Sequence, residues 1–251
     1  SMVNIITTAS ELGYINIPDN TLIDISEMKN YPDEKVVLIT TGSQGENMAA
    51  LSRIAASIHN KIAIKPGDVV LVVGPGPIGD LVAITAKLCG AVIVMSGLTA
   101  DAERMAFARR QFGVDHTVDC QTEDLEAFLK SITDGRGADF VFECTGSRAG
   151  IQSGLKMCKR KGTYVAVGMN MGEIPVDYYN TIYKKEITIQ GDKSTSSITW
   201  VRAMRILNSG QMDLTPLITH RIPMSQWKQG YELCRTGKAM KVVMLPQEDV
   251  Q

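Results

Sequence analysis

The sequence lacks the features that would place it in a specialised class of protein. Its 251 residues carry 26 basic and 27 acidic side chains, so no excess of charge favours nucleic acid or a membrane surface. No apolar run approaches the roughly 18 residues that a membrane span needs, and no basic segment followed by an apolar one indicates a secretory signal. We expect a cytoplasmic globular protein with no membrane partner, and we do not expect RNA as a partner.

Cysteine and histidine are scarce and scattered. The five cysteines are odd in number and form no C-x-x-C pair, which is typical of reduced thiols. The three histidines lie far apart in the sequence, at His59, His116 and His220, and no H-x-H or H-E-x-x-H motif is present. The sequence therefore predicts no metal site.

A glycine-rich turn between a predicted strand and a predicted helix is the strongest motif. The apolar run Val69–Val73 predicts a buried strand, and the pattern over Ile78–Cys89 predicts a helix. Between them lies a G-x-G-x-x-G, in which the glycines allow a tight turn, approach of backbone to a diphosphate, and close packing of helix on strand. The motif predicts a dinucleotide-phosphate site at Gly74, Gly76, Pro77, Ile78 and Gly79.

Two prolines restrict which amides of this turn are able to bind phosphate. Pro75 and Pro77 have no N–H group, which leaves the amides of Gly76 and Ile78 as donors. The positive end of the helix dipole adds to the attraction for an anion. A tight strand-to-helix turn without a ligand stays open as the alternative.

Strand and helix patterns alternate through the rest of the chain. Alternation with continuously apolar strands predicts an α/β fold, a doubly wound, mostly parallel Rossmann-like sheet covered on both faces. Besides the pair above, the expected strands are 91–95, 116–118, 140–143, 164–167, 187–190 and 241–244, and the expected helices are 102–112, 122–132, 150–158, 200–207 and 225–235.

The first sixty residues contain a second strand–loop–helix pattern. The segment Ser1–Tyr14 predicts a short amphipathic helix, and Lys35–Thr40 predicts a buried strand. A loop over Thr41–Glu46 and a helix over Asn47–His59 follow. Successive amides in such a loop form an anion-binding hollow, whereas a plain N-capped turn is an equally open interpretation.

Residues 1–68 resemble the β-CASP domain of ribonuclease J, through the blocks ELGYINIP, KVVLITTGSQGE and MAALSRIA. In that family the TTGSQGE loop contacts the RNA backbone, a role that the resemblance transfers to Ser43, Gln44 and Gly45. The histidine clusters of that nuclease family are not found here. The resemblance thus implies a structural piece that retains, at most, a phosphate-binding loop.

From about residue 62 to residue 246 the chain resembles the cofactor domain of zinc-dependent medium-chain alcohol and polyol dehydrogenases. The matching blocks include IKPGDVVLVVGPGPIG, GADFVFECTGS, KGTYVAVGM and GKAMKVVMLP. The resemblance implies that Thr145 and Gly146 approach the cofactor ribose, and that Val167 and Gly168 lie at the nicotinamide carboxamide. We expect a β-CASP-derived βα extension over 1–64 and a Rossmann NAD(P)-binding domain over 65–251.

The end of the second strand of this domain favours NADP slightly over NAD as cofactor. NAD-binding units usually carry an acidic residue there for the ribose 2′-hydroxyl, but this chain has Gly97. Ser96 is placed to bond a 2′-phosphate and Arg104 to supply charge, although Arg104 is equally well read as a solvated helix residue. Asp80, after the third glycine, departs from the apolar residue usual in the resembled family and disfavours a nearby diphosphate.

Neither resembled enzyme is complete in this chain, because the catalytic zinc domain and the nuclease histidines are both missing. We interpret the chain as a chimera, engineered or recombined, that binds a dinucleotide without a metal and without catalysis. An NAD(P)-dependent alcohol or polyol oxidoreductase and an RNA-binding remnant stay open. The strand over Lys35–Thr40 should enter the parallel sheet through a right-handed crossover, extending its edge or pairing with a second copy in a homodimer.

Overall fold

The computed structural model describes residues 3–6, 38–41, 62–192, 203, 205–207 and 209–245. Its contacts divide the chain into two compact units, Ser1–Met48 with Leu214–Gln251, and Ala49–Asp213. The division at residues 64 and 65, which was drawn from the two resemblances, stays a prediction.

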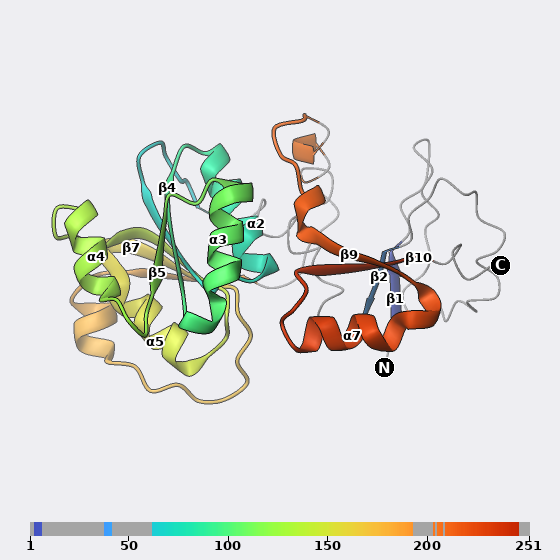
Figure 1. Ribbon diagram of the computed structural model, residues 1–251. Coiled ribbons are helices and arrows are strands. Elements are labelled where there is room, and N and C mark those ends of the chain that lie inside the picture. The colour runs from blue at the N-terminus through green and yellow to red at the C-terminus, as the bar shows by residue number, and fades with distance from the viewer. Residues whose placement is uncertain are drawn as a thin grey trace. The chain divides into compact units, whose positions relative to one another are not determined.

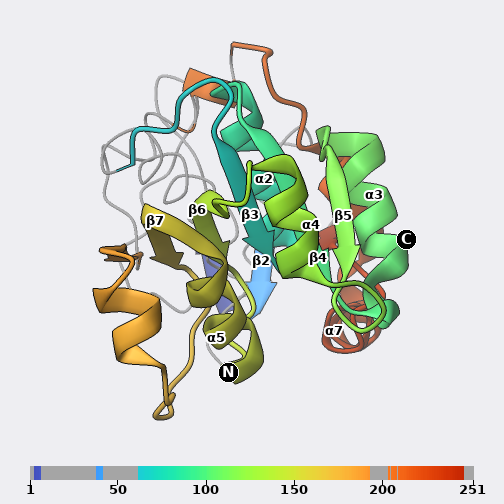
Figure 2. The same cartoon turned by 90° about the vertical axis from the view of Figure 1, so that its left-hand side faces the viewer.

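The larger unit is built on a six-stranded sheet in which all neighbouring strands run parallel (Figure 1). The strand order is β5-β4-β3-β6-β7-β8, and Figure 2 shows most of these strands side by side. Their bounds are β3 Val69–Val73, β4 Val92–Gly97, β5 His116–Asp119, β6 Ala138–Glu143, β7 Cys158–Ala166 and β8 Thr188–Gly191. The predicted α/β Rossmann-like fold is confirmed.

Two pairs of helices cover the two faces of this sheet. The helices α2 (Pro77–Leu88) and α3 (Ala102–Phe112) connect β3, β4 and β5, and they pack on these strands and on each other. The helices α4 (Leu125–Ile132) and α5 (Arg148–Met157) contribute Leu129 and Leu155 to the core on the other face, where they meet alternate residues of β3 such as Leu71. Every residue of β3 is buried because both of its faces are covered.

Local sequence explains where several of these elements begin and end. The side chain of Asp124 caps α4 by accepting a hydrogen bond from the Ala127 N–H at 3.0 Å. Ser147 caps α5 in the same way through the Gly150 N–H at 3.0 Å. The helix α3 ends at Gly113, whose φ of +66° belongs to the left-handed region that glycine adopts without strain.

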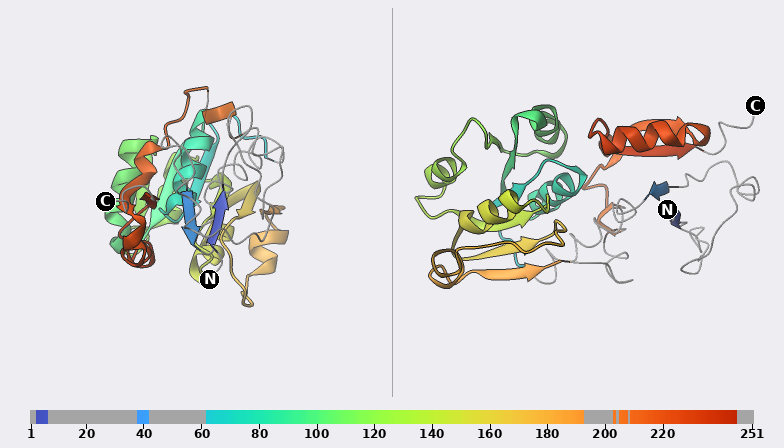
Figure 3. Two further views of the ribbon diagram at one scale, coloured as in Figure 1. Left: turned by 90° about the vertical axis from the view of Figure 1, so that its right-hand side faces the viewer. Right: turned by 90° about the horizontal axis from the view of Figure 1, so that it is seen from below.

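In its described residues, the smaller unit contains two pairs of strands. The strands β1 (Val3–Ile6) and β2 (Leu38–Thr41) pair antiparallel, and β9 (Ile218–Pro223) pairs parallel with β10 (Lys241–Leu245). The helix α7 (Trp227–Arg235) packs on β9 and β10, as the right-hand view of Figure 3 shows. Both α7 and β10 fall where the sequence pattern predicts a helix and a strand.

Two expectations for the N-terminal part are wrong in the described residues. Val3–Ile6 is a strand and not part of an amphipathic helix, because the β-branched residues Val3, Ile5 and Ile6 find a partner strand in β2. The strand β2 pairs with β1 in a sheet of its own and does not join the six parallel strands. The loop residues Ser43, Gln44 and Gly45 and the expected helix over 47–59 lie outside the described residues.

Candidate functional site

The residues expected to bind the cofactor gather where four neighbouring strands end. Val73, at the end of β3, lies opposite Ser96 of β4 and opposite Glu143 of β6, and Glu143 lies opposite Ala166 of β7. The loops that follow therefore leave the sheet at one edge. The strand order also reverses between β3 and β6, which is the point at which open α/β sheets bind their ligands.

The first and third glycines of the turn hold β3 and α2 together. A Cβ atom on Gly79 would lie 2.1 Å from the carbonyl oxygen of Gly74, and one on Gly74 would lie 2.5 Å from Cγ2 of Thr145. Gly74 also has a φ of +107°, and its N–H donates to the carbonyl of Ser96 at 2.9 Å. A side chain at Gly79 would push α2 away from β3, and a side chain at Gly74 would collide with Thr145 in the loop after β6.

The middle glycine stands in open space. A Cβ atom on Gly76 would meet the nearest group, Nη1 of Arg104, only at 4.0 Å. Gly76 is the N-cap of α2 and has no side chain to bond the first-turn amides, which have no partner within a helix. Arg104, in the first turn of α3, lies over the same turn. Exposed amides, a helix N-terminus and a guanidinium group together form a fitting place for a diphosphate.

A buried carboxyl group lies directly after this turn. Asp80 has no exposed surface, and neither of its carboxylate oxygens has a hydrogen-bond partner among the residues that the structure describes. Burial raises the pKa of Asp80 to about 8, although the positive charge of Arg104 works in the opposite direction. The group is therefore mostly protonated at neutral pH, and it adds little negative charge to the turn.

The end of β4 is closely surrounded by other side chains at Gly97. A Cβ atom on Gly97 would lie 3.1 Å from Cγ of Pro75 and 3.2 Å from Cβ of Asp101. The Ser96 side chain is 2% exposed, and its hydroxyl group bonds the thiol of Cys120. The Ser96 hydroxyl would have to give up its bond with the Cys120 thiol to bind a 2′-phosphate. The contact between Ser96 and a 2′-phosphate stays a prediction.

Glu143, which the sequence pattern did not indicate as a site residue, holds the loop after β6 in place. Its fully buried side chain accepts hydrogen bonds from the N–H and hydroxyl of Thr145, at 2.8 and 2.5 Å, and from the N–H of Gly146 at 3.0 Å. Its carbonyl oxygen accepts from Val167 and Gly168, at 3.0 and 2.7 Å. The sequence does offer one sign of this role, which is an acidic residue at the end of the apolar run of β6. A charged group that is buried needs hydrogen-bond partners.

Two glycines allow the loops after β6 and β7 to touch. A Cβ atom on Gly146 would lie 2.3 Å from the carbonyl oxygen of Met169, and one on Gly168 would lie 2.2 Å from the nitrogen of Gly146. Asn170 closes the contact by donating from Nδ2 to the Gly146 carbonyl at 2.7 Å. Thr145, Gly146, Val167 and Gly168 are thereby brought into one backbone cluster.

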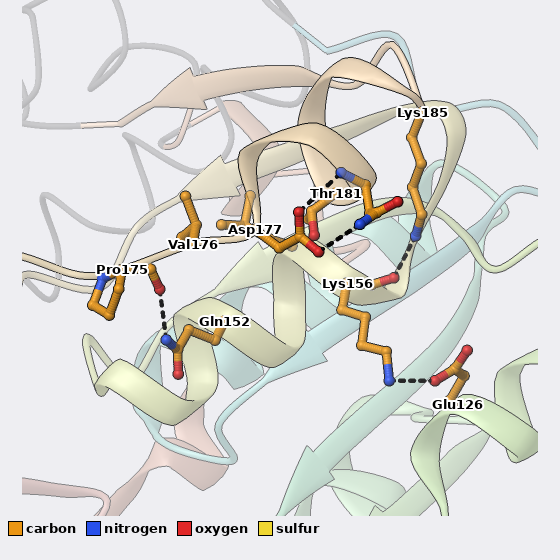
Figure 4. Close-up of a pocket in the computed structure, with 10 residues that line it drawn as sticks. Glu126, Gln152, Lys156, Pro175, Val176, Asp177, Thr181 and Lys185 are labelled. Carbon is orange, nitrogen blue, oxygen red and sulfur yellow. Dashed lines mark hydrogen bonds and ion pairs between the residues drawn. The ribbon is translucent and has the colours of Figure 1, made fainter.

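A separate cavity of about 360 Å³ lies along α5 and contains none of the expected cofactor residues (Figure 4). Its polar groups bind one another. Lys156 pairs with Glu126 at 2.7 Å, Gln152 donates to the carbonyl of Pro175 at 2.6 Å, and Lys185 donates to the carbonyl of Lys156 at 2.6 Å. With these groups already paired, the cavity presents no set of donors that selects a ligand.

The chain matches the family of zinc-binding dehydrogenases over residues 77–209. It is 35% identical to a sorbitol dehydrogenase of Halalkalibacterium halodurans, over 80% of this chain and 59% of that enzyme. It is 30% identical to an L-threonine 3-dehydrogenase of Caldanaerobacter subterraneus subsp. tengcongensis, over 95% of this chain and 71% of that enzyme. The chain therefore belongs to the zinc-binding dehydrogenase family.

The fold agrees with this assignment. An alcohol dehydrogenase from Thermus sp. ATN1 superposes with a TM-score of 0.71 at 24% identity, covering 83% of this chain and 60% of that structure. Residues 1–86 also match the ribonuclease J β-CASP domain, so the two family matches overlap at residues 77–86. The chain spans only 59% of the length of the sorbitol dehydrogenase that it resembles.

The expectation that the protein uses no metal is contradicted by its family, which is defined by zinc binding. The described residues nevertheless do not fit a zinc ion, because no three His, Cys, Asp or Glu side chains among them lie close enough to hold one. In the described part of the chain, no helix combines the length and apolar character that a membrane span requires.

Replacing Glu143 by Ala should lower the free energy of unfolding by about 3 kcal/mol or more, because Thr145 and Gly146 lose a buried charged acceptor. Urea denaturation measures this change. Glu173→Ala, at an exposed position in the same unit, serves as the control and should change stability little. Equal effects of the two substitutions would contradict a bracing role for Glu143.

Asp80→Asn, which keeps the shape of the side chain and cannot ionise, should stabilise the protein increasingly as the pH rises. The pKa of Asp80 is about 8 in the folded protein, above its ordinary value of 3.8. The wild type therefore loses stability relative to the variant between these two values, by about 1.4 kcal/mol for each unit of pKa difference. Denaturation at several pH values tests this, and a constant difference would refute it.

Proposed function

We propose that this chain binds NAD or NADP as the cofactor-binding part of a dehydrogenase that acts on an alcohol or a polyol. The observation that carries the proposal is the open turn at Gly76, which faces Arg104 at the point where the strand order reverses. Membership of the zinc-binding dehydrogenase family supports it. So does the likeness to a sorbitol dehydrogenase, a relative named for a polyol.

In this proposal, the amides of Gly76 and Ile78 hold the cofactor diphosphate and Arg104 balances its charge. The turn after β6, Thr145 and Gly146, approaches the ribose, and the backbone at Val167 and Gly168 meets the nicotinamide carboxamide. The bound nicotinamide would supply hydride transfer, and the residues of this chain would orient it. NADP stays slightly favoured over NAD, because Gly97 stands where NAD-binding units carry an acidic partner for the ribose 2′-hydroxyl.

We also propose that the first 64 residues derive from a β-CASP domain and were joined to the dehydrogenase part by recombination or engineering. The match of residues 1–86 to the ribonuclease J family supports this origin. Under this proposal, Ser43, Gln44 and Gly45 are the remnant of a phosphate-binding loop. They are not expected to bind RNA strongly, because the chain has no excess of positive charge.

A homodimer through the β8 edge of the sheet is a further part of the proposal. Among the described strands, β8 ends the sheet and has only β7 as a neighbour. Exposed apolar side chains lie on it and beside it, with Ile189 at 47% and Tyr183 at 65% exposure. An edge strand of this kind is a template for pairing with the same strand of a second copy.

Gly76→Ala should weaken dinucleotide binding tenfold or more, by roughly 1.4 kcal/mol, while leaving the fold intact, because the added methyl group points into the space where the phosphate would lie. Titration with NADPH and NADH, followed by fluorescence, measures this loss. Gly191→Ala is the matched control, since a Cβ atom there meets nothing within 4 Å. A wild type that shows no saturable binding of either nucleotide would refute the proposed function.

Ile189→Lys should convert a dimer into a monomer, because a charged side chain on the edge strand disfavours pairing of two copies. Light scattering coupled to gel filtration measures the mass of each form. Leu88→Lys, at a residue that is 40% exposed at the end of α2, should leave the dimer unchanged. A wild type of monomer mass would exclude the proposed interface.

A further inference from the structure

The buried carboxyl group of Asp80 requires an explanation that the fold does not supply. A polar group without a hydrogen-bond partner costs free energy when it is removed from water, and both oxygens of Asp80 are in this situation. An apolar residue at this position would cost less free energy of folding. Asp80 stands one residue after Gly79, in the first turn of the helix that points at the proposed phosphate position.

The face of α2 that carries Asp80 is directed toward α3. Asp80 and Lys87 are seven residues apart and so lie on one face of the helix. Lys87 pairs at 2.6 Å with Asp115, a residue just beyond the end of α3. From α3, the charge of Arg104 acts on Asp80, and Nη1 of Arg104 lies 4.0 Å from where a Cβ atom of Gly76 would be. Asp80 and a bound phosphate would thus act on the same guanidinium group.

The other charged groups around Asp80 do not take the place of Arg104. The strands on which α2 packs, β3 and β4, carry no ionisable side chain. Asp101, before α3, accepts a hydrogen bond from the N–H of Leu98 at 3.0 Å, and Glu103 is exposed. Among the described residues, Arg104 is therefore the cation that the charge state of Asp80 most directly affects.

We propose that Asp80 sets the affinity of the dinucleotide site, because its charge state decides how strongly Arg104 and the N-terminus of α2 attract the phosphates of the cofactor. This inference rests on the proposed function. An ionised Asp80 offsets part of the positive charge of Arg104 and places a negative charge beside the diphosphate. A protonated Asp80 does neither, so the protonated form of the protein binds the dinucleotide more tightly.

Binding is consequently coupled to the uptake of a proton. Burial raises the pKa of Asp80 to about 8 in the protein without ligand, and a phosphate placed beside Arg104 raises this pKa further. At a pH between the two values, binding brings one proton onto the carboxyl group. The dissociation constant should stay constant below about pH 7 and rise by up to tenfold per pH unit above about pH 8.

The experiment is calorimetric titration of the full chain with NADH, whose diphosphate has the same charge at every pH from about 6.5 to 9.5. Two buffers of different ionisation enthalpy report how many protons are taken up. The wild type should take up a fraction of a proton near pH 8 and lose affinity above it. Asp80→Asn should take up none and bind with nearly the same affinity throughout, so that at high pH it binds about tenfold more tightly than the wild type.

Two further variants keep the result interpretable. Asp134→Asn makes the same change of charge at a side chain that is 93% exposed, in the turn between α4 and β6, and should keep the pH dependence of the wild type. Asp80→Leu removes the carboxyl group altogether and should behave like Asp80→Asn. Circular dichroism confirms that each variant is folded before it is titrated.

The inference and the proposed function fail in different ways. If Asp80→Asn and the wild type bind NADH with the same pH dependence and the same proton uptake, the role of Asp80 is refuted while dinucleotide binding stands. If no form of the protein binds NADH or NADPH at any pH, the proposed function is refuted, and the role of Asp80 with it.

Discussion

The close approach of α2 to the end of β3 is the constraint on which the rest of the larger unit depends. Gly79 lies so near the carbonyl oxygen of Gly74 that no side chain fits between them. This contact brings the N-terminus of α2 to the edge where β3 and β6 diverge, and it leaves Gly76 facing open space. Because a strand, a turn and a helix are fixed together, the first-turn amides hold one position without a ligand to order them.

Two buried carboxyl groups lie near this turn, and they differ in whether hydrogen-bond donors surround them. Glu143 is surrounded by hydrogen-bond donors from Thr145 and Gly146, so its charge is compensated and it ties the loops after β6 and β7 together. Asp80 is buried and has no donor among the described residues, so burial raises its pKa to about 8 and it is mostly neutral at pH 7. The first group stabilises the architecture of the site, whereas the second is a cost to stability that the fold does not require.

In the N-terminal segment, the pattern of a few residues was not enough to distinguish a helix from a strand. The residues Val3–Ile6 fit a helical period, but they also have the β-branched side chains that favour a strand, and the partner strand Leu38–Thr41 decided between the two. The pattern over Lys35–Thr40 predicts a strand, and the structure has the strand β2 at Leu38–Thr41, but the prediction that this strand joins the parallel sheet is wrong. A strand pattern states nothing about which neighbour will pair with it.

The sequence by itself determined the sheet, its helices and the place of the glycine turn, because apolar periodicity and glycine spacing are local properties of the chain. Tertiary structure alone decided that Arg104 lies over Gly76, that Glu143 braces the loop of Gly146, and that Asp80 is buried without a partner. These facts depend on elements separated by many residues in the chain. Burial and electrostatic contact arise only when such elements pack together, and no local pattern of residues encodes them.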